Sequence, residues 1–115
     1  MPNYEANYEK IKNDIIKISL KGFLDAHTAS DFEDLLSKLI DEGNIKFLID
    51  LEDLDYISST GLGVFMGYIE QIREEGGDIK FINVPKNIYK IFSVLGFSTI
   101  YEIYDDNESA VNNFD

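Results

Sequence analysis

Residues 47–75 read FLIDLEDLDYISSTGLGVFMGYIEQIREE, and this stretch decides the fold. It begins with a short apolar run bounded by acids, Phe47–Leu51, which is typical of a buried strand. Ser58-Ser59-Thr60-Gly61 follows where a helix should start. Apolar residues then recur at the spacing of one helical face: Leu62, Phe65, Met66, Ile69 and Ile72. Three hydroxyls therefore lie at a predicted strand-to-helix turn, where unpaired backbone N–H groups face outward.

The residues before this stretch predict a β-hairpin. Residues 4–9 and 16–21 each alternate apolar and polar side chains, with the turn residues Asn13-Asp14 between them. We expect a half-exposed sheet face here, and we expect Gly22 to end the hairpin.

A helix is expected next, from about Thr28 to Asp41. Thr28 is its candidate N-cap, with Asp31 three residues on as half a capping box, and Gly43 is the residue expected after its end. Its apolar stripe consists of Ala29, Phe32, Leu35, Leu36, Leu39 and Ile40.

The remaining elements follow the pattern of an α/β domain. Ile45–Leu51 is apolar on both faces, which favours a covered and mostly parallel sheet. The central helix should end at Gly76-Gly77, and the next strand, Ile79–Val84, makes a right-handed strand-helix-strand unit. We predict one domain over residues 1–115, an α/β fold with a single mixed β-sheet of about five strands flanked by about four helices.

The C-terminal third supplies the last helices and strand. Pro85 should open a helix that stops at Gly96, and Ile100–Tyr104 should be the last strand. The buried face of that helix should hold Ile88, Ile91, Phe92 and Leu95. Asp106 can cap a short terminal helix whose apolar residues are Ala110, Val111 and Phe114. Phe97 can be read as core or as partly exposed.

Composition narrows the function classes. The formal net charge of −12 argues against nucleic-acid partners and anionic membrane surfaces, and it favours a partner with a basic patch. The chain has no cysteine, so disulfides, thiol catalysis and cysteine-based zinc sites are excluded. No signal peptide or membrane-length apolar run is visible, so we expect a cytoplasmic protein, monomeric when free.

Several chemical interpretations of the central turn are possible from the residues alone. Helix capping is the simplest one for Ser58-Ser59-Thr60. A dinucleotide site is disfavoured because Met66 stands where the third glycine belongs, and a hydrolase triad of Asp25, His27 and Ser59 lacks the usual nucleophile elbow.

Two further features of this region have simple structural interpretations. The acid row from Asp50 to Asp55 lacks EF-hand spacing, so we expect a solvated surface, no metal and no cofactor. Gly63 and Gly67 form a strip without side chains that either the sheet or a partner could use.

Two separated motifs resemble the anti-sigma factor antagonists of the STAS domain family. One is Asp50-Leu51-Glu52-Asp53-Leu54 with Ile57-Ser58-Ser59-Thr60-Gly61-Leu62-Gly63, and the other is residues 20–29, LKGFLDAHTA. The similarity covers roughly Asp14 to Val111. The family pattern usually has an acid before its phosphorylated serine, whereas Ser58 precedes the matching Ser59 here.

The resemblance implies a STAS fold and a regulatory cycle. The unphosphorylated protein would bind an anti-sigma factor serine kinase and free a sigma factor, and phosphorylation of Ser59 with the kinase's own ATP would end the complex. A serine phosphatase would reset the protein, which has no catalytic residues of its own. The implied partner-binding residues are Asp25, Ser58, Ser59, Thr60, Gly61, Leu62 and Gly63. The alternative is a STAS docking module of a stressosome-like or membrane-transport complex, without regulation by phosphorylation.

Overall fold

The computed structural model describes residues 4–114 and contains one mixed five-stranded sheet with the strand order β1-β2-β3-β4-β5. β1 and β2 form the antiparallel hairpin, and β3, β4 and β5 continue the sheet in parallel with β2. The α/β class and the mixed sheet of five strands are confirmed. The strands are β1 (Tyr4–Lys10), β2 (Ile16–Leu24), β3 (Lys46–Ile57), β4 (Asp78–Ile82) and β5 (Glu102–Tyr104).

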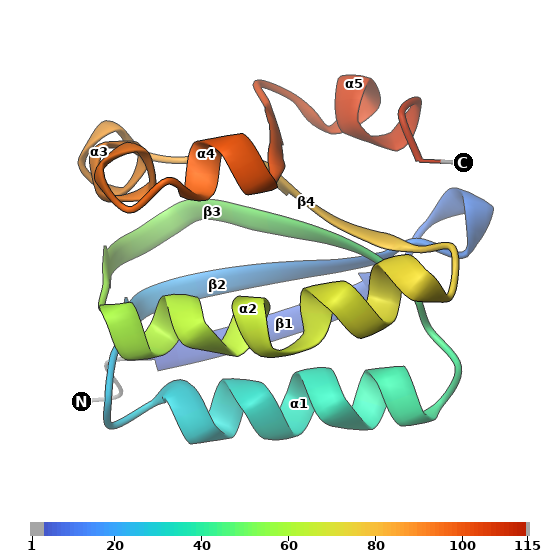
Figure 1. Cartoon of the computed structure of the whole chain (residues 1–115), viewed down its shortest axis with the longest axis horizontal. Helices are drawn as coiled ribbons and strands as arrows, with labels where there is room; N and C mark the ends of the chain where they lie inside the picture. Colours follow the sequence, from blue (N-terminus) through green and yellow to red (C-terminus); the bar gives the residue numbers. More distant parts are fainter. Residues whose placement is uncertain (1–3, 115) are drawn as a thin grey trace.

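Five α-helices cover the sheet within residues 4–114. They are α1 (Ala29–Asp41), α2 (Ser59–Glu74), α3 (Lys86–Val94), α4 (Phe97–Ile100) and α5 (Asn107–Val111), and a short 3₁₀ turn, η1 (Lys12–Asp14), joins the first two strands. α1 and α2 run side by side along the sheet (Figure 1). Buried residues of α1 to α4 belong to one core, while α5 packs on a second cluster with Ile15, Leu48 and Ile82.

Aromatic rings form the centre of the main core. Phe65 of α2 contacts Phe32 of α1 at a centroid distance of 5.1 Å and Phe81 of β4 at 5.0 Å. Phe81 in turn meets Phe92 of α3 edge-on at 5.3 Å. Phe97, which the sequence left undecided, is buried at 4% exposure. This continuous packing holds α1, α2 and α3 in fixed positions over one face of the sheet.

The ends of β2 and β3 correct two predictions. Gly22 does not end the hairpin, because β2 runs through it to Leu24 with Gly22 at φ 85°. β3 does not end at Leu51 but continues to Ile57, paired with β2 across two register shifts. The two strands therefore extend together to the beginning of α2.

Several local predictions also need correction. Thr28 stands at the N-cap of α1, but its hydroxyl donates to the Phe23 carbonyl at 2.8 Å instead of capping the helix. Met66 and Leu95, expected in buried faces, are 44% and 53% exposed. The expected strand from Ile100 begins later, at Glu102, because residues 97–100 form α4.

Other helix ends lie where the sequence predicts them. α1 is followed by Gly43, α3 begins after Pro85 and is followed by Gly96, and Asp106 caps α5 through a bond from Ser109 N at 2.8 Å. Along residues 4–114, no helix combines the length and the apolar character that crossing a bilayer requires.

Candidate functional site

The site is the turn between β3 and α2. Ser58 is the N-cap of α2, with extended backbone, and its Oγ accepts a hydrogen bond from Gly61 N at 3.2 Å. The Ser58 N–H donates to the Leu24 carbonyl at 2.9 Å, which ties the turn to the end of β2. One of the three hydroxyls is therefore used to cap the helix.

Ser59 is the first residue of α2 and its side chain is exposed. Within residues 4–114, the backbone N–H groups of Ser59 and Thr60 form no hydrogen bond, and the first turn of α2 carries no acidic side chain. The positive end of the helix dipole is thus uncompensated beside an exposed hydroxyl. A phosphate on Ser59 would meet free donors there without entering the core.

Gly61 is required by a close approach of two backbones. A Cβ at this position would lie 2.6 Å from the Leu24 carbonyl oxygen and 2.9 Å from the Leu24 Cγ. Gly61 and Leu62 are both buried, so their part in a partner surface would be indirect, through the shape of the turn.

Asp25 lies beside this turn because it follows Leu24, whose carbonyl accepts from Ser58. Its Oδ1 accepts a hydrogen bond from His27 N at 2.9 Å, and its backbone N–H donates to the Thr28 Oγ1 at 2.9 Å. No hydrogen bond joins Asp25 to Ser59 in the described part of the chain, and His27 is exposed in the loop before α1. Asp25 therefore stabilises its own loop, and this loop lies next to the Ser59 turn.

A shallow groove runs beside the turn, between the first halves of α1 and α2. It has a volume of about 280 Å³, and Ala29, Glu33, Thr60, Gly63 and Gly67 are among its lining residues. A Cβ built on Gly63 or Gly67 would meet nothing within 4 Å. The glycine strip therefore faces outward, and the sheet does not use it.

The acidic residues before the turn differ in their exposure to solvent. Glu52, Asp53 and Asp55 are exposed, as a solvated surface requires. Asp50 is half-buried and accepts from Asn83 Nδ2 at 3.2 Å, with Lys17 Nζ 3.9 Å away. In the described residues, no cluster of three or more His, Asp or Glu side chains could hold a metal ion.

An exposed aromatic pair, which was not predicted from the sequence, also lies near the turn. Phe23 and Tyr56 are 41% and 43% exposed, with ring centroids 5.9 Å apart. They are register partners at the ends of β2 and β3. Their position directly before Leu24 and Ile57, which are buried, could have indicated rings on the outer face of a half-covered strand pair.

Comparison with known proteins agrees with this architecture. The family model of the STAS domain matches residues 7–110. The anti-sigma-B factor antagonist of Bacillus subtilis is 29% identical over 109 residues, which cover 95% of this chain and 98% of that protein.

Two solved structures of the anti-sigma factor antagonist SpoIIAA, one of them described as from Bacillus, have the same fold. The unphosphorylated form has a TM-score of 0.80 at 21% identity, with 95% of this chain and 94% of that chain covered. The phosphorylated form has a TM-score of 0.74 at 22% identity, with 94% and 97% covered. Because the family model matches residues 7–110, which are nearly the whole chain, the chain belongs to the STAS domain family.

Proposed function

We propose that this protein is an anti-sigma factor antagonist whose binding to an anti-sigma factor kinase ends when Ser59 is phosphorylated. The proposal rests on the different roles of two serines at the start of α2. Ser58 caps the helix, and Ser59 is exposed beside free N–H groups. The names of the relatives support the regulatory role.

The switch follows from charge and desolvation. A phosphate brings about −1.5 to −2 charges at pH 7, and the helix start stabilises it inside this chain. A partner packed on the turn would have to remove water from that charge. A loss of about 3 kcal/mol would weaken the complex about a hundredfold.

The surface offered to the kinase would be formed by the exposed residues around Ser59. Thr60 and Gly63 are exposed on the same side of α2, and the outward glycine strip lets a partner helix or loop approach closely. Asp25 and Ser58, both half-buried, would contribute the edge of this surface. In this scheme the chain is substrate and switch, the kinase supplies ATP, and a serine phosphatase restores the binding form.

The phosphorylation step is tested by incubating the protein with the anti-sigma factor kinase and ATP. We expect a mass increase of about 80 Da, the mass of one phosphoryl group, on the peptide that contains Ser59. Ser59→Ala should remain unmodified, while Ser58→Ala and Thr60→Ala, which keep Ser59, should still be modified. Phosphate on Ser58 or Thr60 in the wild-type protein would contradict the assignment.

The binding step is tested by calorimetry with the same kinase. Ser59→Asp should fold with an unchanged circular dichroism spectrum and bind about a hundredfold more weakly, since the added charge has to be desolvated. Ser59→Ala should bind like the unmodified protein. A Ser59→Asp variant with full affinity would remove the physical basis of the switch.

A further inference from the structure

The acidic residues of this chain are unevenly distributed. The sequence has 22 Asp and Glu residues, yet residues 79–101 contain none. This segment includes all of α3, which carries the exposed cations Lys86 and Lys90. Within residues 4–114 neither lysine forms an ion pair. The outer side of α3 is therefore a positive surface on a strongly negative protein.

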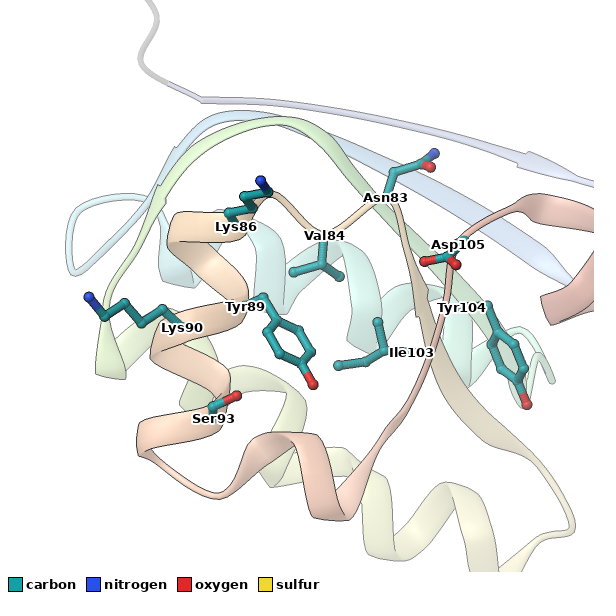
Figure 2. A pocket seen from close by; sticks show the side chains of 9 residues that line it. All are labelled: Asn83, Val84, Lys86, Tyr89, Lys90, Ser93, Ile103, Tyr104 and Asp105. Atoms are coloured by element: carbon teal, nitrogen blue, oxygen red, sulfur yellow. The ribbon is translucent and has the colours of Figure 1, made fainter.

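A groove of about 660 Å³ lies beside this helix, between α3 and the strand β5 (Figure 2). Figure 2 shows the Tyr89 ring of α3 and the Ile103 side chain of β5 pointing toward one another across it, with Val84 above them in this view. Lys86 and Lys90 lie on the α3 side, where Figure 2 shows the Lys90 side chain extending away from the groove, and Asp105 lies on the opposite side. The groove thus has an apolar floor with Lys86 at its α3 edge, and Lys90 adds a second exposed cation on the outer side of α3.

Two apolar residues at the end of α3 are also exposed, outside the groove. Val94 is 77% exposed and Leu95 is 53% exposed, and Tyr89 in the groove is 45% exposed. Of these three, Tyr89 lines the groove, and an exposed apolar side chain in a groove is typical of an interaction site. The nine residues of α3 span about 13 Å at 1.5 Å per residue, which is longer than a single small anion needs.

The groove is built on a fixed frame. Asn87 Nδ2 donates to the Asp55 carbonyl at 3.2 Å, which attaches the start of α3 to the end of β3. On its inner side, α3 is held by Ile88 and Phe92, which are fully buried. The α3 edge and the floor of the groove are therefore formed before any ligand arrives.

We propose that α3 and the β5 groove form a second docking surface, which binds an acidic, amphipathic peptide segment of a partner protein. The segment lies along α3 with its apolar side chains over Tyr89 and Ile103. Its carboxylates face Lys86 and Lys90. This surface shares no lining residue with the Ser59 turn and has the opposite charge preference, so the two surfaces select different partners.

The test uses a synthetic peptide of about twelve residues, with leucine on one helical face and glutamate elsewhere. It is titrated into the ¹⁵N-labelled full chain and followed by NMR. We expect the largest shift changes in residues 83–95 and 103–105, with none in the Ser59 turn, and an affinity that falls as salt is added. Lys86→Glu with Lys90→Glu should weaken binding about tenfold or more.

The matched control is Lys12→Glu with Lys38→Glu, which makes the same change in net charge at two exposed lysines elsewhere. This control should lose at most about twofold, since distant surface charges are screened. Equal losses in both double variants would overturn the proposal, as would shift changes centred on the Ser59 turn. Two further results would overturn the proposal. The same shift changes with acetate alone would identify a small anion as the occupant, and the same changes on concentrating the protein without peptide would identify a second copy of the chain.

Discussion

Replacing Gly61 with alanine tests the packing that positions the site. The added Cβ would lie 2.6 Å from the Leu24 carbonyl oxygen, well short of the 3.4 Å at which ordinary contact begins. The obstacle is backbone, which cannot rotate away as a flexible side chain could. The Leu24 carbonyl would have to move, and it also accepts the 2.9 Å bond from Ser58 N.

The expected change in the free energy of unfolding of Gly61→Ala is the sum of opposing effects. Overpacking lowers the free energy of unfolding by about 1–3 kcal/mol, and weakening of the Ser58 bond lowers it by about 1 kcal/mol. The higher helix propensity of alanine, worth about 1 kcal/mol, offsets part of this loss. We expect a net loss of about 2 kcal/mol in the free energy of unfolding. For a domain of this size, that loss lowers the Tm by roughly 6–12 °C.

The measurement is urea unfolding followed by circular dichroism, with Gly63→Ala and Gly67→Ala as matched controls. Both controls lie in the same helix with nothing within 4 Å of the new Cβ, so they should be more stable than wild type by about 0.5–1 kcal/mol. The reasoning is refuted if Gly61→Ala is as stable as the controls, or if the controls lose as much as it does.

Two further predictions concern single interactions. Ser58→Ala removes the acceptor for Gly61 N and should cost about 1 kcal/mol in urea unfolding, while Ser58→Asp, which can still cap, should stay close to wild type. Hydrogen bonds from Lys80 and Tyr104 hold the pKa of Glu102 below its ordinary value of 4.5, so its stabilising contribution is complete above that pH and is lost as the pH falls through the folded-state pKa. The stability gap between wild type and Glu102→Gln should therefore be present at pH 7 and should close in acid; a gap that widens below pH 4 would contradict this.

The order and type of the main elements could be predicted from the sequence, but the length of β3 could not. Its second half buries Leu51, Leu54 and Ile57 at intervals of three, which does not match the alternation of a regular strand. The register shifts against β2 explain this spacing, since each shift places an extra residue on β3 and reverses which side chain faces inward. Such bulges depend on the partner strand and leave no periodic signal in the sequence of β3 itself.

Leu95 and Met66, which were predicted to lie on apolar helix faces, are exposed for different reasons. Leu95 continues the spacing of Ile88 and Phe92, but α3 ends at Val94 and the chain turns at Gly96, so Leu95 leaves the buried face. Met66 lies at the edge of the α2 stripe, while Val64 is buried on the side where α1 packs. In both cases the helical period is right, and the neighbouring elements decide the width of the face.

The three hydroxyls of the central turn could be located from the sequence, but their roles could not be separated. Ser58, Ser59 and Thr60 are all good residues for a helix start, and the difference between them arises from backbone geometry. Ser58 has extended backbone and reaches Gly61 N, whereas Ser59 is already helical and points to solvent. The contacts that fix the turn, from Ser58 and Gly61 to Leu24, do not include the Ser59 hydroxyl. In the proposed switch, a charge placed on Ser59 would therefore change what the surface can bind while the contacts that hold the fold stay intact.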